Sequence, residues 1–147
     1  MILEVSRKIR TLSRTDHYRQ AATLLVSIPG ISTLSAMILL TELIDISRFK
    51  TPNHLRSYIG IVPGENSTGE EETLTGLTPR RNPFLRTLLV EAAWVPVRKD
   101  PALILTFTQL SARMKKNEAI IRIARKLSNR IWYVLTQGQP YQLGVVE

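Results

Sequence analysis

Ser67 and Thr68 are the hydroxyl side chains best placed for chemistry, because they lie in a glycine-rich stretch that leads into a basic segment. Glycines at positions 64, 69 and 76 surround this pair, and such a composition favours turns over a long regular element. The dipeptide at residues 82–83, Asn-Pro, predicts a helix start, because asparagine caps helices and proline suits their first position. The sequence therefore predicts a long polar loop that delivers hydroxyl groups to a helix N-terminus.

Three arginines flank this predicted helix start, namely Arg80, Arg81 and Arg86, with the capping residue Asn82 between them. Backbone N–H groups at a helix N-terminus and guanidinium groups both bind phosphate oxygens. The segment is therefore a candidate phosphate site. On spacing alone, a serine such as Ser67 is more often a turn or cap residue than a nucleophile, and neither histidine of the chain lies near it in sequence to act as a base.

The sequence predicts that the secondary-structure elements on both sides of these candidate residues are helices. The same two-residue start, a capping residue followed by proline, occurs at residues 51–52, 82–83 and 100–101, and this repetition favours an all-helical layout. Apolar residues spaced by three and four predict further helices over residues 2–13 and 19–28. Residues 33–44 are apolar on nearly all sides, which is typical of a buried helix. Pro96 is expected to end or kink the helix that begins at position 83.

A long helix is predicted over residues 116–136, with an apolar stripe on one side and basic residues on the others. Such a helix suits packing on a core while its basic side meets a nucleic acid, although a solvated surface explains each single cation as well. The candidate contacts are Lys115, Lys116, Arg122, Arg125 and Lys126, and Arg130 is assigned to the same outer side.

A tight turn is predicted where Pro29 and Gly30 separate two apolar helices, with Ser32 positioned to cap the second helix. This order is similar to a helix-hairpin-helix, whose hairpin amides contact a nucleic-acid backbone without reading bases. Proline-glycine is also an ordinary connector between helices. Pro29, Gly30, Ile31 and Ser32 are therefore candidate backbone contacts.

The charge distribution indicates a polyanionic partner. The net charge is +8, and residues 80–130 hold twelve Lys or Arg against three acids, whereas residues 42–72 hold six acids against three bases. Neutralising phosphates releases counterions and supplies most non-specific nucleic-acid affinity. Tyr58, Trp94, Trp132 and Tyr133 could stack on unpaired bases, although aromatic residues among leucines at helical spacing more often belong to the core.

Several classes of site are not expected. The chain has no cysteine, which excludes disulfides and thiolate zinc sites. The consecutive glutamates at 70–72 should face solvent, so no metal is expected in this chain. No apolar run reaches the ~18 residues of a membrane span, and the charged start does not suit a signal peptide. We expect a cytoplasmic protein with no membrane contact. The expected organisation is a compact all-α domain at residues 19–141, preceded by a helical arm at 1–18 and followed by a tail at 142–147.

Four ordered blocks carry a resemblance to a known family: LLVSIPGIS, DISRFKTPNHLRSYIGIVPGENSTG, GLTPRRNPFLRTLLVEAAW and KKNEAIIRIARKLSNRIWYVL. Together they resemble the C-terminal domain of bacterial insertion-sequence transposases of the IS110 type over about residues 24–141. The resemblance implies a preceding RuvC-like domain with four metal-binding acids, so that divalent metal is expected only there. It also implies DNA and a structured guide RNA as partners, and a homo-oligomeric full-length protein.

The resemblance further implies that a serine in this domain attacks a DNA phosphate and holds the strand as a phosphoserine ester. Carried onto this sequence, that residue is Ser67, or Thr68 if the register shifts by one residue. The function expected is DNA binding and strand transfer, with no activity in the absence of the N-terminal domain. The alternative is a non-catalytic binding or assembly module in which Ser67 only shapes a turn.

Overall fold

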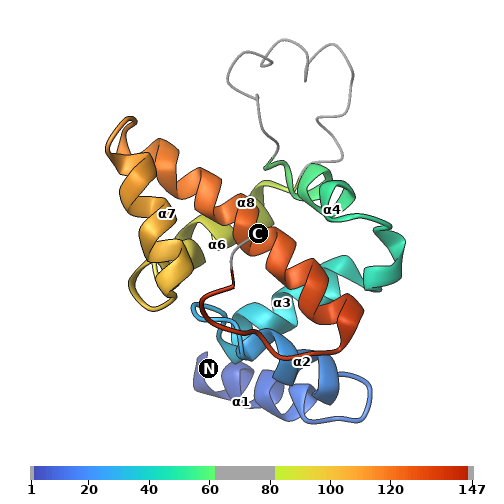
Figure 1. Cartoon of the computed structure of the whole chain (residues 1–147). Coiled ribbons are helices and arrows are strands. Elements are labelled where there is room, and N and C mark those ends of the chain that lie inside the picture. Colours follow the sequence, from blue (N-terminus) through green and yellow to red (C-terminus); the bar gives the residue numbers. More distant parts are fainter. Residues whose placement is uncertain (1, 62–81, 146–147) are drawn as a thin grey trace.

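The computed structural model describes residues 2–61 and 82–145, and in these ranges it contains α-helices and short 3-10 helices but no strand (Figure 1). This confirms the predicted all-α class. The helices, in chain order, are α1 (Ile2–Ser13), α2 (Arg19–Val26), α3 (Thr33–Leu43), η1 (Ile46–Arg48), α4 (Pro52–Ile59), α6 (Pro83–Ala93), η4 (Pro96–Arg98), α7 (Pro101–Ser111) and α8 (Lys116–Gln137).

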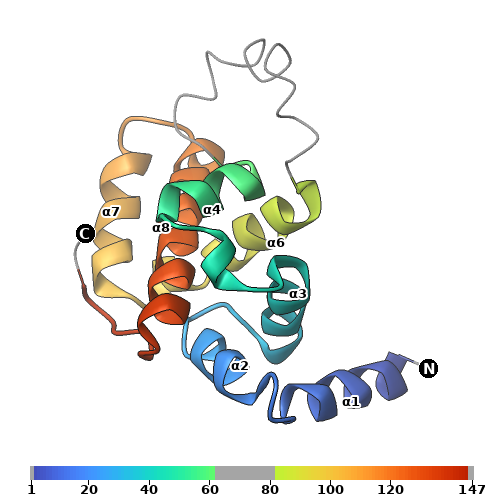
Figure 2. The same ribbon diagram turned by 90° about the vertical axis from the view of Figure 1, so that its right-hand side faces the viewer.

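Helix α8 is the central element, and α2, α4, α6 and α7 all pack against it (Figures 1 and 2). The predicted apolar stripe faces these neighbours, since its members are all buried. They are Ile120, Ile123, Ala124, Leu127, Ile131 and Val134. Fully burying a side chain of this size contributes roughly 1.5–3 kcal/mol, so tertiary packing accounts for most of the stability of α8.

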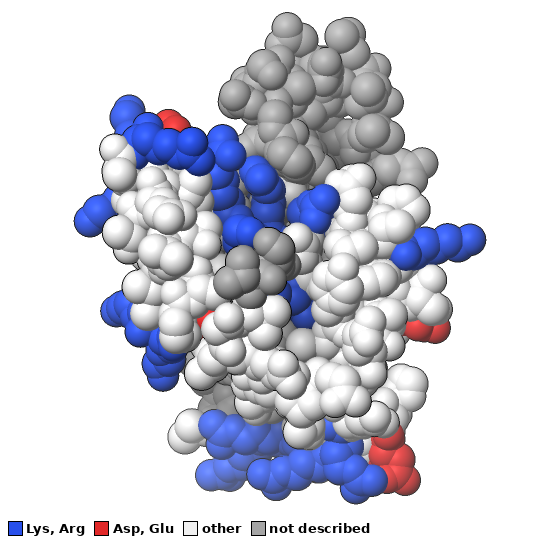
Figure 3. All heavy atoms as spheres, viewed as in Figure 1, with Lys and Arg blue, Asp and Glu red and all other residues white. Residues whose placement is uncertain are grey.

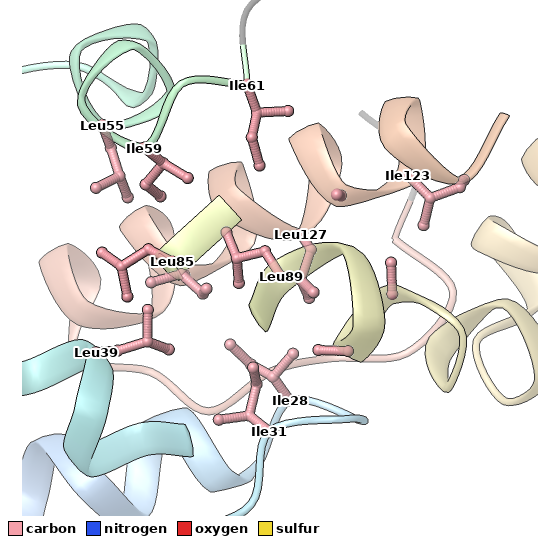
Figure 4. Packing of buried hydrophobic residues seen from close by; sticks show 14 of the residues in the cluster. Ile28, Ile31, Leu39, Leu55, Ile59, Ile61, Leu85, Leu89, Ile123 and Leu127 are labelled. Atoms are coloured by element: carbon pink, nitrogen blue, oxygen red, sulfur yellow. The ribbon is translucent and has the colours of Figure 1, made fainter. Parts of the chain in front are cut away.

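One continuous hydrophobic core joins the helices (Figure 4). Leu55 and Ile59 of α4 point toward Leu85 of α6, and Leu127 of α8 lies next to Leu89 of α6 in the same cluster. Ile28 and Ile31, from the turn between α2 and α3, enter the same core from another side. The two parts of the chain that flank residues 62–81 are therefore fixed on one packed body.

All three predicted cap-and-proline helix starts are confirmed. The Thr51 hydroxyl accepts from the His54 N–H at 3.2 Å, and the Asn82 side-chain oxygen accepts from the Leu85 N–H at 3.1 Å. Asp100 does the same for Ala102 N–H at 3.0 Å. Proline follows each cap at the first helical position, where its missing N–H costs no hydrogen bond. Helix α6 ends before Pro96, as expected.

Helix α1 forms over the predicted residues and packs against α3 at one end of the molecule (Figure 2). Ile2, Leu3, Val5 and Leu12 remain exposed, by 81%, 71%, 52% and 43%. The amphipathic pattern thus predicts the helix correctly, but most of its apolar side is not covered by the described residues.

Candidate nucleic-acid interface

The predicted turn between α2 and α3 is present. Gly30 has φ +97°, and the Ile31 N–H donates to the Ile28 carbonyl oxygen at 3.1 Å, as a proline-glycine turn of type II requires. Ser32 is the N-cap of α3, since its hydroxyl accepts from the Ser35 N–H at 3.1 Å. The sequence prediction of a tight turn with a serine cap is confirmed.

The hairpin is held against the end of α6. A Cβ added to Gly30 would lie 2.5 Å from the Ala92 carbonyl oxygen and 3.2 Å from Cβ of Val95. Ile31 is only 3% exposed, so its side chain and its N–H both serve the fold. Ser32 is exposed, and phosphate contact at this hairpin stays a prediction.

The surroundings of the hairpin are apolar. A groove of about 360 Å³ lies between α3 and α6, and its lining includes Gly30, Leu34 and Phe84. As far as the structure describes the chain, this lining contains no lysine or arginine and includes Glu91. Any phosphate bound in this groove would therefore depend on uncharged donors, namely backbone N–H groups and the hydroxyls of Ser35 and Thr87.

Substituting Gly30 by alanine is expected to destabilise the fold more than the same change at Gly138, by about 1–3 kcal/mol, because overpacking adds to backbone strain. Both glycines have positive φ, but no atom of the described residues lies within 4 Å of a Cβ at Gly138. Urea denaturation of the two variants measures the difference. Equal losses of stability would contradict the close approach of Gly30 to Ala92.

Asn82 serves the fold with both ends of its side-chain amide. Its oxygen caps α6, and its Nδ2 donates to Glu42 Oε1 on α3 at 2.7 Å. The sequence predicts both this cap and a nucleic-acid contact at Asn82, whereas the bond to Glu42 could not be read from spacing. Arg86, one turn further along α6, is exposed. Ser67, Thr68, Arg80 and Arg81 lie outside the described residues.

The candidate cations at the start and in the first half of α8 lie on the side of the helix that faces solvent. Lys115, Lys116 and Arg122 are exposed. Arg125 and Lys126 are half-buried, and each takes part in an interaction with another group. Figure 3 shows Lys and Arg atoms gathered over the α7–α8 end of the molecule and again along α1, with few acidic atoms on this side.

Arg130 corrects the sequence interpretation, because it does not lie on the outer basic side of α8. It is 7% exposed and forms an ion pair with Asp100 at 3.6 Å. Its guanidinium also donates to the Tyr141 hydroxyl at 3.0 Å and to the Val145 carbonyl oxygen at 2.8 Å. The signal was present in the spacing: Arg130 lies seven residues after Ile123 and four before Val134, which places it beside the apolar stripe.

These bonds fix the C-terminal segment across α8. The Gly144 N–H donates to Asp100 Oδ1 at 2.8 Å, the Tyr141 hydroxyl donates to Asp100 Oδ2, and the Tyr141 N–H donates to the Ser27 hydroxyl at 2.9 Å. Burial raises the pKa of Tyr141 well above its usual value, and the hydrogen bond to Asp100 raises it further. Residues 141–145 are thus docked on the domain.

Two further properties concern the described residues alone. In residues 2–61 and 82–145, no three histidine, aspartate or glutamate side chains come together as a metal-binding group. Within the same ranges, no helix combines the length and the apolar character needed to cross a lipid bilayer.

These features define a small all-α domain with a hairpin packed on its core and a cation-rich side along its longest helix. The chain belongs to the IS116/IS110/IS902 transposase family, because the model of that family matches residues 22–109, more than half of its length. The predicted family resemblance is confirmed.

Curated relatives agree with this assignment. The chain is 34% identical to the transposase for insertion sequence element IS1111A of Coxiella burnetii, over 80% of this chain and 34% of that protein. It is 31% identical to the transposase for insertion sequence element IS1328 of Yersinia enterocolitica, over 93% of this chain and 41% of that protein. The chain therefore spans about a third to two-fifths of the length of these relatives.

Proposed function

We propose that this chain is the DNA-contacting domain of an insertion-sequence transposase and supplies the serine nucleophile of strand transfer. The observation that carries the proposal is the family match over residues 22–109, because it includes Ser67 together with the helices on both sides of it. The two ends of the intervening segment start from fixed points, since Ile61 is 2% exposed and Asn82 is tied to both α6 and α3.

The proposed reaction is a transesterification at a DNA phosphate. The Ser67 oxygen forms a bond to phosphorus, the bond from phosphorus to one deoxyribose oxygen breaks, and a proton moves from the hydroxyl to the released oxygen. A serine hydroxyl is a weak nucleophile and needs a base or local positive charge, and the pentavalent transition state needs stabilisation of its negative oxygens. Arg80, Arg81 and Arg86 are the proposed source of that charge.

The proposal includes partners beyond this chain. A preceding RuvC-like domain with four acids would hold divalent metal, a structured guide RNA would select the DNA sites, and the full-length protein would act as a homo-oligomer in the bacterial cytoplasm. Within this chain, the exposed cations of α8 support DNA binding, because phosphate neutralisation provides affinity without regard to sequence.

Replacing both Lys116 and Arg122 by glutamine should weaken DNA binding. For each phosphate contact that is lost, the slope of log affinity against log salt concentration should become shallower by about 1. The affinity at 0.15 M salt should fall on the order of fivefold for each lost contact. Fluorescence anisotropy with a labelled duplex at several salt concentrations measures both quantities. Lys50→Gln is the control, because Lys50 is exposed but lies beside α4 rather than on α8.

An unchanged slope in the double variant would exclude α8 from the interface. If the slope falls but no full-length protein ever forms a covalent product, the chain would be a binding module without a nucleophile.

A further inference from the structure

The C-terminal segment turns back across α8 (Figure 1). A pocket of about 780 Å³ opens between this segment, the start of α4 and the second half of α8. We propose that this pocket accepts one unpaired nucleotide of a nucleic-acid strand, an inference that rests on the proposed nucleic-acid binding. Its volume lies in the range of roughly 300–1,000 Å³ that is typical of pockets for small organic groups.

The lining of the pocket is positively charged. Among the residues that the structure describes, it includes Arg56 and Arg130 but no aspartate or glutamate. Asp100, which pairs with Arg130 but is not one of the lining residues, offsets the charge of Arg130. Arg56 hydrogen-bonds to the side-chain oxygens of Asn129 and, at 3.0 Å, of Asn53. Both partners are neutral amides, so within residues 2–61 and 82–145 these bonds do not offset its positive charge. In Figure 3, Lys and Arg atoms are visible in the hollow beside the C-terminal segment.

Both arginines have an unused donor. The Nε atoms of Arg56 and Arg130 are buried and have no hydrogen-bond partner in the described part of the chain. Arg130 is more than nine-tenths buried, and a buried donor without an acceptor costs about 1–3 kcal/mol. Because these Nε atoms are closed off from solvent, a ligand reaches them only if the side chains rearrange, and the attraction of the pocket for electronegative atoms comes from the guanidinium charge.

The uncharged part of the lining suits a nucleobase. Tyr133 is 48% exposed and offers a ring, while Val134 and Pro140 add apolar surface. Side-chain amides of Asn129 and Gln137, among others, supply both donors and acceptors. Unpaired bases are bound in this way, by stacking on an aromatic ring and by hydrogen bonds from amides to the base edge. A base within a duplex could not present its edge here, so the nucleotide must be unpaired or extruded.

The basic side of α8 leads into the pocket. Lys115, Arg122, Asn129 and Tyr133 fall within about 40° of one another around the helix axis, because each residue of an α-helix advances by about 100°. Lys115 and Arg122 lie near the N-terminal half of α8, and the pocket residues Asn129 and Tyr133 lie in its C-terminal half. A strand whose phosphates contact Lys115 and Arg122 would therefore place its neighbouring nucleotides at the pocket.

The test compares three ligands of equal length on the 147-residue chain: a single-stranded oligonucleotide, the same strand with abasic positions, and a duplex. The single strand should bind on the order of tenfold more tightly than the abasic strand, as stacking on one aromatic ring implies. Tyr133→Ala should remove that preference, whereas Tyr133→Phe should keep it. Arg56→Gln should weaken binding of the single strand in the same way. Parallel DNA and RNA strands show which nucleic acid uses the pocket.

The outcomes separate this inference from the proposed function. If the α8 charge variant weakens binding of all three ligands while Tyr133→Ala leaves the preference for bases intact, the pocket proposal is overturned and the DNA-binding proposal stands. If none of the ligands binds, both fail. The nucleotide site would likewise be overturned if the single strand bound no more tightly than the abasic strand, while a glutamate-rich peptide bound the chain and lost this binding in Tyr133→Ala.

Discussion

Ser67→Ala, introduced into a full-length protein that includes the preceding domain, should abolish the covalent DNA–protein adduct while DNA binding persists. Alanine removes the oxygen that would bond to phosphorus. A nicked DNA substrate, denaturing electrophoresis and a parallel binding assay measure the two effects. The expected change is from a clear denaturation-resistant band to none.

Thr68→Ala is the matched control for this experiment, because it removes a hydroxyl from the residue next to Ser67. It should retain the adduct. An adduct that survives Ser67→Ala but disappears in Thr68→Ala would assign the nucleophile to Thr68. An adduct that survives both changes would contradict the proposed role of this loop.

Asp100→Ala should lower the free energy of unfolding by about 3–5 kcal/mol, because it leaves the buried charge of Arg130 without its partner. Asp100 is 0% exposed and also accepts from the N–H groups of Ala102 and Gly144. Losing it removes the cap of α7 and releases the segment that carries Tyr141. Equilibrium denaturation in urea measures the loss, and a loss of this size can unfold a small domain.

Asp16→Ala provides the comparison, since Asp16 also pairs with an arginine, Arg19, at 3.4 Å. Both side chains of that pair are largely exposed, and exposed ion pairs contribute little to stability. The Asp16 variant should therefore unfold almost as the unmodified chain does. If both variants lost a similarly small amount of unfolding free energy, the Asp100–Arg130 pair would not be important for the stability of the fold.

Local chemistry in the sequence predicts the helices well. Thr51, Asn82 and Asp100 each cap a helix that proline opens, and the stripe from Ile120 to Val134 faces the core as its spacing indicates. These features depend on residues within one or two turns of each other, so periodicity and capping rules suffice to find them. The all-α class follows from the same signals.

Contacts between distant residues could not be predicted in this way. The approach of Gly30 to Ala92, the bond from Asn82 to Glu42 and the docking of Tyr141 on Asp100 join residues 40 or more positions apart. Each depends on how helices pack in space, which no local pattern contains. The pocket between α4, α8 and residues 139–145 arises from the same kind of packing.

The most direct test of the central claim is to identify the residue that bonds to DNA. The adduct from the full-length protein can be trimmed with nuclease, digested with trypsin and examined by tandem mass spectrometry. Trypsin cuts after Arg56 and Arg80, so the proposed nucleophile lies in the peptide of residues 57–80. We expect a nucleotide-derived phosphate on Ser67 of that peptide. A DNA remnant on a residue outside residues 57–80 would contradict the account.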